Sequence, residues 1–270
     1  MTDKTFIITG TTGFIGGSLY RLLKSNKVKC IGVSRNKSDN SDYCVKNYSE
    51  VINLYDQNTY LINFAGDNRE ISQDEINMLE ILSARFKDRM FFMSSAQVYG
   101  LEHKYSNEES SKLDGITDYA KKKIFAEKLV LSNKGKILRL SNIYGKGMSF
   151  DTVWHDILNQ VKNNNNLITL KNKLAIRDFL YIDDFCSLIY KIILSDENLN
   201  VINVGSGKGT SLVSITNLIY QKIYPNRPLP EILSKNDVEI CNILNINLAM
   251  REYDWEPHID IKEGISRWLA

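Results

Sequence analysis

Residues 5–16 have the sequence TFIITGTTGFIG, in which a short apolar run ends at a segment rich in glycine and threonine. The continuous apolar run at 5–9 is typical of a strand that is buried on both faces. Residues 18–24, SLYRLLK, have the apolar spacing of a helix, so the glycines lie between a strand and a helix. Glycines at such a junction let the backbone turn sharply and let a pyrophosphate approach the helix N-terminus, where N–H groups favour anions. The pattern predicts a dinucleotide site, with an unliganded tight turn as the alternative, and its candidate residues are Gly10, Thr12, Gly13, Phe14, Ile15 and Gly16.

The first half of the chain continues this alternation of strand and helix. Runs typical of strands occur at 28–33, 60–64, 89–93 and 136–140, and a short, weak strand is expected at 42–45. Helical periodicity occurs between them, at 49–55, 74–86 and 118–131. Strands that alternate with helices form βαβ units, in which the strands are parallel. We therefore predict an α/β fold with a Rossmann-type, doubly wound parallel sheet.

The second half of the chain is less regular. We expect strands at 175–182 and 201–204, and helices at 151–162, 183–194, 211–223, 246–253 and 261–268. All four prolines occur after residue 224, which favours a smaller, loop-rich lobe. We therefore predict a dinucleotide-binding domain at 1–145 and a mainly substrate-binding lobe at 146–270. As an alternative for part of this lobe, elements of 176–205 belong to the first domain.

The composition is that of a folded globular protein: 43% of the 270 residues are hydrophobic and 24% are charged. The net charge of +2 argues against a dedicated nucleic-acid-binding protein. No apolar run approaches the roughly 18–20 residues that a membrane helix needs. The cysteines, at positions 30, 44, 186 and 241, are too scattered for a zinc site or a disulfide framework. We expect a cytoplasmic protein with reduced, buried thiols that binds no metal, nucleic acid or membrane.

The end of the second predicted strand bears on the choice of dinucleotide. NAD-binding proteins place an acidic residue here, which accepts hydrogen bonds from the adenosine ribose. This chain has Ser34 and Arg35 instead. A guanidinium can pair with a 2′-phosphate, so the chemistry favours NADP, with NAD possible and a solvated loop arginine as the alternative.

Three residues of the middle segment have the chemistry of proton transfer. Ser95 follows the predicted strand at 89–93 and so lies near the carboxyl edge of the sheet, where open α/β sheets bind ligands. Tyr119 and Lys123 are four residues apart at the start of a predicted helix and share one of its faces. A free tyrosine has a pKa near 10, and we expect the ammonium and an oxidised nicotinamide to lower it. We predict that these three residues are catalytic.

Together these segments resemble the extended short-chain dehydrogenase/reductases, specifically the NAD(P)-dependent epimerase/dehydratase group that acts on nucleotide sugars. The resemblance extends over nearly the whole chain. It rests on motifs at 9–16 (TGTTGFIG), 63–66 (NFAG), 94–100 (SSAQVYG), 119–123 (YAKKK), 139–145 (RLSNIYG), 177–184 (RDFLYIDD), 203–206 (NVGS) and 254–257 (DWEP).

The resemblance implies a role for each matching residue. Ser95 would hydrogen-bond the reacting oxygen, Tyr119 would exchange its proton, and Lys123 would bind the nicotinamide ribose. Asn63 and Ala65 match cofactor-binding positions. Asn142 and Arg177 match positions that contact the nucleotide diphosphate, with a turn asparagine and a surface arginine as the alternatives. Many relatives have an arginine in the last lobe where this chain has Lys235, so that contact is either replaced or lost.

The residues after Ser95 exclude some reactions of the resembled family. Its 4,6-dehydratases have an Asp-Glu pair there and its decarboxylases a glutamate, whereas this chain has Ala96 and Gln97, which cannot exchange protons in that way. Enzymes that epimerise at C3 and C5 use a cysteine and a histidine, and we expect His103, His155 and His258 to be surface or structural residues.

Two reactions that need only hydride transfer remain. One is NADPH-dependent reduction of a 4-keto-6-deoxy nucleotide sugar, and the other is 4-epimerisation with tightly bound NAD. Arg35 and the short chain favour the reduction, because the chain resembles compact deoxysugar 4-ketoreductases of surface-polysaccharide synthesis. A non-enzymatic dinucleotide sensor or scaffold is a remote third hypothesis, since such proteins usually lack the tyrosine or the lysine.

The resemblance also implies a homodimer, because relatives often pair through the helix that carries the tyrosine and lysine. The apolar candidates on the predicted helix at 118–131 are Ile124, Phe125, Leu129 and Val130, and packing inside one chain is the alternative.

Overall fold

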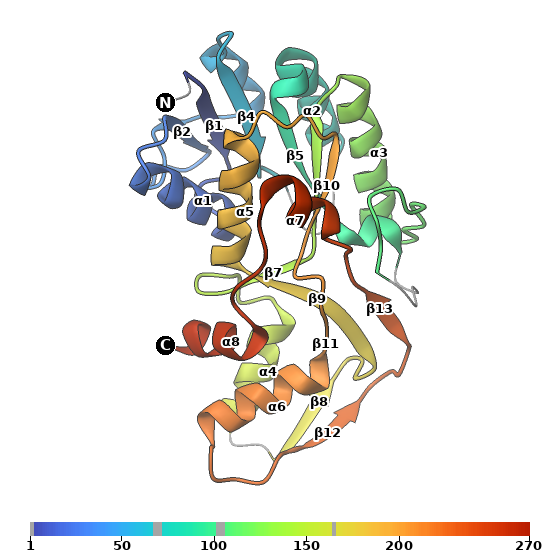
Figure 1. Cartoon of the computed structure of the whole chain (residues 1–270). Coiled ribbons are helices and arrows are strands. Elements are labelled where there is room, and N and C mark those ends of the chain that lie inside the picture. Colours follow the sequence, from blue (N-terminus) through green and yellow to red (C-terminus); the bar gives the residue numbers. More distant parts are fainter. Residues whose placement is uncertain (1–2, 67–71, 101–105, 164–165) are drawn as a thin grey trace.

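The computed structural model describes residues 3–66, 72–100, 106–163 and 166–270. Figure 1 shows a large sheet flanked by helices, with a second, smaller lobe beside the carboxyl edge of its strands. The N-terminus lies at the sheet and the C-terminus in the smaller lobe (Figure 1).

Seven parallel strands form the large sheet, in the order β10-β6-β5-β4-β1-β2-β3. Their bounds are Thr5–Thr9 (β1), Cys30–Ser34 (β2), Tyr43–Cys44 (β3), Thr59–Asn63 (β4), Met90–Ser95 (β5), Lys136–Leu140 (β6) and Val201–Val204 (β10). The strand order reverses between β1 and β4, which is the switch point of a doubly wound sheet. The predicted Rossmann-type α/β fold is confirmed.

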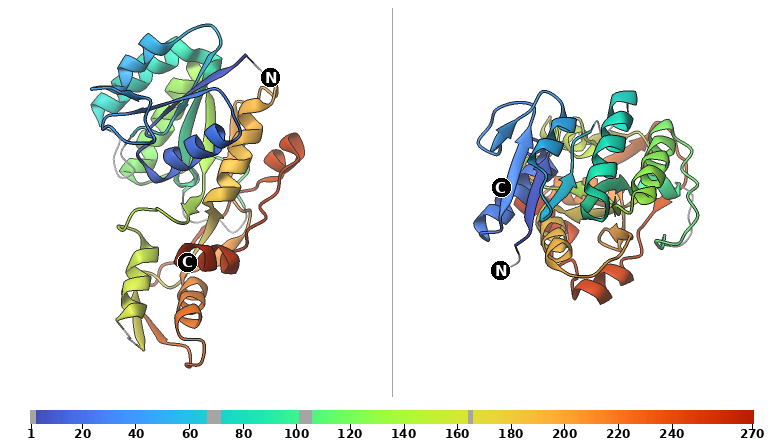
Figure 2. Two further views of the ribbon diagram at one scale, coloured as in Figure 1. Left: turned by 90° about the vertical axis from the view of Figure 1, so that its left-hand side faces the viewer. Right: turned by 90° about the horizontal axis from the view of Figure 1, so that it is seen from above.

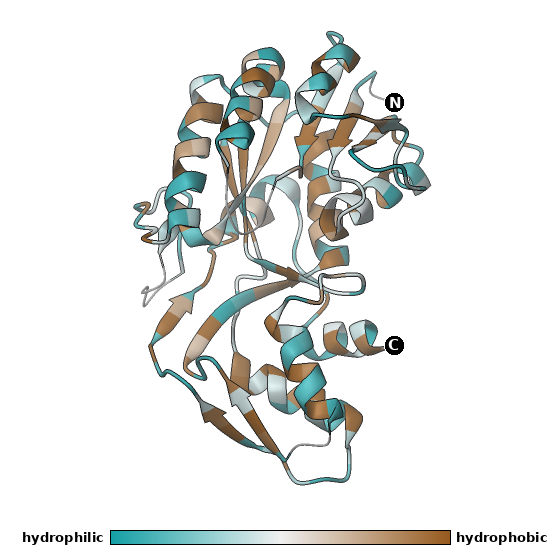
Figure 3. Ribbon diagram, turned by 180° about the vertical axis from the view of Figure 1, so that it is seen from behind, coloured by the Kyte–Doolittle hydropathy of each residue, from teal (hydrophilic) through white to brown (hydrophobic). Residues whose placement is uncertain are grey.

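Helices cover both faces of this sheet, as the view from above in Figure 2 shows. Phe6 and Ile8 of β1 pack in the cluster that contains Leu19 of α1 (Phe14–Ser25) and Ile189 of α5 (Ile182–Leu194). Ile7 points to the opposite face, where α2 (Gln73–Phe86) and α3 (Asp118–Ser132) pack. Because neighbouring residues of a strand point to opposite faces, a sheet buried on both faces needs continuous apolar runs. Figure 3 shows these strands in hydrophobic colours.

The smaller lobe has sheets of its own. Strand β9 (Ala175–Tyr181) pairs with β7 (Asn142–Tyr144), β11 (Gly209–Ser211) and β13 (Ile240–Asn242), and β8 (Leu167–Leu170) pairs with β12 (Glu231–Ser234). The helices of the second half are α4 (Val153–Lys162), α5, α6 (Leu212–Ile223), α7 (Asn247–Tyr253) and α8 (Ile261–Leu269). The sequence analysis missed five of these strands, because runs of three or four residues with mixed exposure have no clear periodicity. The predicted domain boundary near residue 145 stays a prediction.

Some local expectations need correction. The segment predicted as a helix at 49–55 is a 3-10 helix, η1 (Tyr48–Leu54), and two further 3-10 turns, η2 (Lys87–Arg89) and η3 (Ala96–Tyr99), flank β5. Cys44 is exposed, so the expectation of buried thiols is wrong for it, whereas Cys30 and Cys186 are buried. All four cysteines are free thiols.

Two of the three histidines fall within the described residues. His155 is buried at the start of α4, where it interacts with Thr152 and packs against Trp268, and His258 is exposed. His103 lies outside the described residues. Within the described ranges, no helix is long and apolar enough to cross a membrane. The same ranges contain no group of three or more His, Cys, Asp and Glu side chains that could hold a metal ion.

Candidate active site

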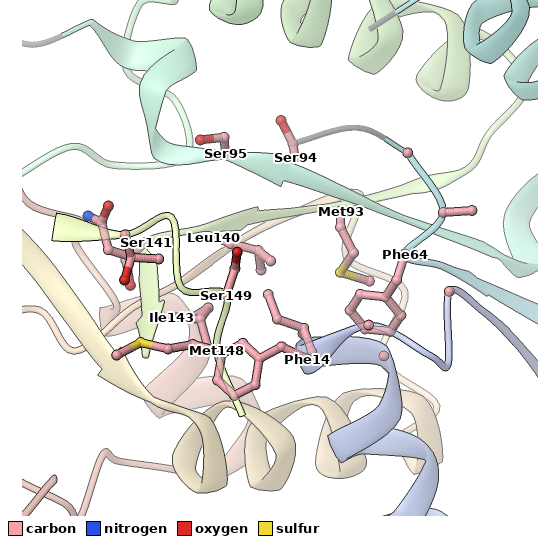
Figure 4. A pocket seen from close by; sticks show the side chains of 18 of the residues that line it. Phe14, Phe64, Met93, Ser94, Ser95, Leu140, Ser141, Ile143, Met148 and Ser149 are labelled. Carbon is pink, nitrogen blue, oxygen red and sulfur yellow. The ribbon is translucent and has the colours of Figure 1, made fainter. Parts of the chain in front are cut away.

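A cavity of about 800 Å³ lies at the carboxyl ends of β1, β4, β5 and β6, between the large sheet and the smaller lobe. It is where a doubly wound sheet binds its ligand, because the loops after the strands diverge at the switch point. Figure 4 shows Ser94 and Ser95 on one side of this cavity and Phe14, Ile143 and Met148 on the other. The predicted residues that line it are Gly10, Thr12, Gly13, Phe14, Ile15, Gly16, Arg35, Asn63, Ala65, Ser95, Tyr119, Lys123, Asn142 and Arg177.

The glycine turn between β1 and α1 has the shape of an anion site. Gly10 has φ +70°, a conformation that favours glycine, and a Cβ on Gly16 would lie 2.6 Å from the Gly10 carbonyl oxygen. The structure describes every residue of α1, and this helix has neither an acidic residue in its first turn nor a side chain that caps it. The N-terminal N–H groups of α1 therefore face the cavity without a competing anion, and the turn fits a dinucleotide pyrophosphate.

The two residues at the end of β2 differ in position. Arg35 is exposed and lines the cavity, with its guanidinium carbon 5.7 Å from the centroid of the Tyr48 ring. The Ser34 hydroxyl is buried, donates to the carbonyl of Asn36 and lies 2.6 Å from the hydroxyl of Ser41. Ser34 is not among the described residues that line the cavity. Its hydroxyl is committed to the following loop, so Arg35 alone remains as the candidate for a 2′-phosphate contact.

A buried threonine fixes the end of β4 beside the glycine turn. The Thr9 hydroxyl donates to Asn63 Oδ1 at 2.7 Å and accepts from the N–H groups of Phe64 and Ala65, both at 3.1 Å. These bonds hold the segment that contains Asn63 and Ala65 against β1. Thr9 was not among the predicted site residues, although it begins the motif at 9–16, because its side chain lies in a strand and its contacts depend on the neighbouring strand β4.

Ser95 and Tyr119 meet at one end of the cavity. Ser95 ends β5 and its hydroxyl accepts from the N–H of Gln97 at 3.2 Å, while Tyr119 lies in the first turn of α3, which Thr117 caps. Burial raises the pKa of Tyr119, and a hydrogen bond with the Ser95 side chain opposes that rise. The expectation of a lowered pKa is therefore wrong for the protein by itself, because burial outweighs the hydrogen bond.

Lys123 lies one turn further along α3. Its ammonium donates to the carbonyl of Met93 at 2.9 Å and lies 4.7 Å from the Phe92 ring centroid and 5.8 Å from the Tyr119 ring centroid. Burial lowers the pKa of Lys123 to about 8, against the carboxylates of Glu75 and Glu127, which raise it. The structure thus brings an alcohol, a phenol and an ammonium together in one cavity, as the sequence analysis predicted.

Two candidates for the diphosphate lie on the smaller lobe. Asn142 donates from its side chain to the carbonyl of Asp178 at 2.9 Å, which ties β7 to β9. The buried Nε of Arg177 has no hydrogen-bond partner among the described residues, and burial lowers the pKa of this guanidinium. A buried donor without a partner is costly, and an anionic ligand would satisfy it. Lys235 is exposed after β12 and is absent from the described lining of the cavity.

The cavity contains residues that the sequence analysis did not select. Ser141, between β6 and β7, has a buried hydroxyl without a hydrogen-bond partner in the described part of the chain. Tyr48, Met148, Trp154 and Phe179 add apolar and aromatic surface. Ser141 lay inside a matched motif, and its small polar side chain there was the available signal. Phe179 also lay inside a matched motif, at 177–184, whereas Tyr48, Met148 and Trp154 come from segments whose contact with the site depends on the tertiary fold.

Comparisons with known proteins agree with this geometry. The model of the NAD dependent epimerase/dehydratase family matches residues 6–205. The chain is 26% identical over 299 residues to a putative UDP-glucose 4-epimerase from Methanocaldococcus jannaschii, covering 97% of this chain and 96% of that protein. It is 27% identical over 198 residues to a dTDP-4-dehydro-6-deoxyglucose reductase from Escherichia coli, covering 67% and 60%.

A solved structure is similar over its whole length. A variant of UDP-glucuronic acid 4-epimerase from Bacillus cereus, in complex with UDP-4-deoxy-4-fluoro-glucuronic acid and NAD, has a TM-score of 0.83 and 18% identity. The match covers 98% of this chain and 97% of that one. At this identity the likeness shows the fold.

Proposed function

Because the chain belongs to the NAD dependent epimerase/dehydratase family, it is an enzyme, and we propose that it reduces the 4-keto group of a 4-keto-6-deoxy nucleotide sugar with NADPH. The observation that carries this proposal is the meeting of Ser95, Tyr119 and Lys123 in the cavity that the glycine turn also lines. The relative from Escherichia coli, named as a reductase of such a sugar, supports it.

Each of the three side chains has a defined task in this reaction. The hydroxyl of Ser95 and the phenol of Tyr119 would hold the ketone oxygen between them. Tyr119 would donate its proton to that oxygen, so that the carbonyl becomes an alcohol. Its raised pKa suits this role, because a phenol that stays protonated at neutral pH is available as an acid. Lys123 supplies a positive charge that stabilises the phenolate left behind.

The residues around the glycine turn would hold the cofactor. A nicotinamide dinucleotide supplies the hydride when it is bound. Gly10, Gly13 and Gly16 would admit its pyrophosphate, and Asn63 and Ala65 would lie beside it. Arg35 is the residue that we assign to the 2′-phosphate, and it is the reason to prefer NADPH over NADH.

The substrate would lie against the smaller lobe. Arg177 lines this cavity and has an unpartnered Nε among the described residues, and its guanidinium would pair with the diphosphate, with Asn142 as the second lining candidate. Lys235 is exposed and does not belong to the described lining of the cavity, so no observation supports it as a contact to the diphosphate. An 800 Å³ cavity has the size of a small-molecule site and holds parts of both ligands.

Epimerisation at C4 is the second candidate, and the relative named a putative 4-epimerase favours it. The same three side chains could remove a proton and return it. The two reactions differ in the fate of the cofactor, because an epimerase regenerates its NAD and a reductase consumes NADPH.

An assay with purified protein separates the two candidates. We expect NADPH oxidation at 340 nm with 4-keto-6-deoxy nucleotide sugars. Interconversion of nucleotide-sugar epimers without NADPH oxidation would overturn the reductase. Replacement of Tyr119 by Phe should lower kcat by about 10²- to 10⁴-fold without loss of NADPH binding. A matched pair, Lys123→Met and Lys121→Met, tests the lysine: the first should lose activity, while the second changes an exposed neighbour.

We also propose a cytoplasmic homodimer that acts in surface-polysaccharide synthesis. Phe125 on α3 is 50% exposed and Ile81 on the adjacent helix α2 is 45% exposed, which gives an apolar surface for a partner. Ile124 and Leu129 are partly buried, and Val130 is fully buried in the core, so Val130 is no longer a candidate for this contact. Sedimentation of the protein as a monomer at micromolar concentration would contradict the dimer.

A further inference from the structure

A buried ion pair links α3, the helix that carries Tyr119 and Lys123, to strand β6. Glu127 of α3 and Arg139 of β6 are 1% and 4% exposed. Arg139 donates from its NH2 nitrogen at 2.8 Å and from Nε at 3.3 Å to one carboxylate oxygen, and from Nε at 3.1 Å to the other. Both charges are therefore removed from water and held in a fixed geometry.

The pair is attached to both elements that carry the site. Glu127 follows Lys123 by four residues on α3, which places the two side chains on one face of the helix. The same carboxylate accepts a hydrogen bond from the hydroxyl of Ser94, the residue before Ser95 on β5. Glu127 thereby connects the helix that carries Tyr119 and Lys123 with the strand that carries Ser95.

Arg139 extends this connection to the turn after Ser95. Its NH1 nitrogen donates to the hydroxyl of Tyr99 at 2.8 Å and to the carbonyl of Glu109 at 2.9 Å. The Tyr99 hydroxyl donates in turn to Asn203 Oδ1 on β10 at 2.7 Å. Tyr99 closes η3, whose N-cap is Ser95. One guanidinium thus holds the helix, the turn and the edge of the sheet around the site.

Stability alone does not account for such a pair. Removing two charges from water is costly, and apolar side chains of similar volume often serve as well or better in a protein core. We propose that Glu127 and Arg139 are positioning residues that hold the Lys123 ammonium and the Ser95 hydroxyl in register and keep negative charge beside the ammonium. This inference rests on the proposed function for its catalytic consequence.

The electrostatic part of the inference concerns the charges that face Lys123. Glu127 faces it from α3 and Glu75 from α2, while Tyr119 lies beside it on its own helix and β5 contributes the Met93 carbonyl. Burial lowers the pKa of Lys123 to about 8. Removal of one neighbouring negative charge would lower this pKa further, towards neutral pH. Loss of the Glu127 charge would therefore leave less ammonium at pH 7 to 8.

The first test is the titration of Lys123 in the full chain, which requires no substrate. Glu127→Gln keeps the shape of the side chain and removes its charge. Its Lys123 side-chain NMR signal, assigned by its loss in Lys123→Met, should titrate at a pH lower by roughly 0.5 to 1 unit than in the unchanged protein. Glu80→Gln, an exposed carboxylate on α2, is the control and should leave this titration unchanged. An unchanged titration in Glu127→Gln would overturn the electrostatic role whatever reaction the enzyme performs.

The second test separates positioning from folding. The double variant Glu127→Leu with Arg139→Met replaces the pair by apolar side chains, and we expect its Tm to fall less than that of either single variant, because neither charge is left buried without its partner. Its kcat with the substrate that the assay identifies should fall roughly 10-fold or more, with a smaller change in KM. If the double variant does not fold, Ser94→Ala, which removes one hydrogen bond to Glu127, should lower kcat by about 3-fold or more while its Tm falls by only a few degrees. Wild-type kcat in the folded variant would overturn the positioning role.

Discussion

The two sides of the cavity are built in different ways. On the sheet side, the glycine turn supplies its binding groups from one continuous segment, and the close approach of Gly16 to the Gly10 carbonyl fixes its shape. On the lobe side, the groups come from β7, α4 and β9, which are far apart in the sequence. The sheet side offers backbone N–H groups of α1 that no side chain caps, whereas the lobe side has buried side-chain atoms of Ser141 and Arg177 that lack partners in the described structure.

This difference indicates how the two ligands are recognised. A pyrophosphate is common to all dinucleotides, so one rigid backbone turn can serve it. The lobe side presents side chains, whose replacement changes the shape and charge of the site without changing the sheet. Buried polar groups without a partner give specificity. A ligand that forms hydrogen bonds with them binds more tightly than one that does not, because the second ligand leaves them buried and unpaired.

The largest effect is expected on the sheet side, from Gly16→Val. A Cβ at this position would lie 2.6 Å from the Gly10 carbonyl oxygen, so the backbone must move. The displaced turn would no longer fit the pyrophosphate, and we expect the Kd for NADPH to rise by roughly 10- to 100-fold. Calorimetric titration measures it. The Kd of this variant for the nucleoside diphosphate should stay nearly unchanged. An equal rise in Kd for both ligands would show that the two sides of the cavity do not bind them independently.

A comparable effect is expected on the lobe side from Arg177→Met. Loss of the guanidinium should raise KM for the nucleotide sugar roughly 10- to 100-fold, because charge-assisted hydrogen bonds to the diphosphate are lost. The Tm should not fall, since the change removes a buried nitrogen without a partner. Lys235→Met is the matched control and should change neither quantity. A lower Tm with an unchanged KM would assign Arg177 to structure.

A smaller effect is expected from Arg35→Ala at the adenosine end. The KM for NADPH should rise by about 10-fold while that for NADH stays the same, because NADH has no 2′-phosphate. Initial rates with each dinucleotide give the ratio. Lys37→Ala, an exposed cation in the same loop, serves as the control for general charge effects. A native preference for NADH would show that Arg35 is a solvated loop residue.

The smallest effect is expected from Ser141→Ala. Ser141 lines the cavity, and its buried hydroxyl has no partner in the described residues, so removal of the hydroxyl should leave the Tm unchanged or slightly raised. If a ligand completes this hydrogen bond, kcat/KM should fall roughly 3- to 10-fold. Thermal unfolding and steady-state kinetics on the same preparation test both statements. An unchanged kcat/KM would show that Ser141 does not contribute to recognition of the ligand.

The sequence predicted the sheet side well and the lobe side poorly. The apolar run of β1, the spacing of Gly10, Gly13 and Gly16, and the helix and strand periodicities of the first half are all local features. They can be read from neighbouring residues in the sequence. Arg177 was identified only through a resemblance. Ser34 seemed an equal partner of Arg35, yet its hydroxyl bonds to Asn36 and Ser41. The ammonium and an oxidised nicotinamide were expected to lower the pKa of Tyr119, but in the chain by itself burial, which no motif encodes, raises it.

The sequence by itself determined the parallel sheet, the glycine turn and the identity of the groups that can transfer a proton, because these depend on residue type and short spacings. Tertiary structure alone decided which polar groups stay unpartnered, how deeply Tyr119 and Lys123 are buried, and that Glu127 of α3 meets Arg139 of β6. Burial and pairing depend on elements that are distant along the chain, and the energy of a charge depends on what surrounds it.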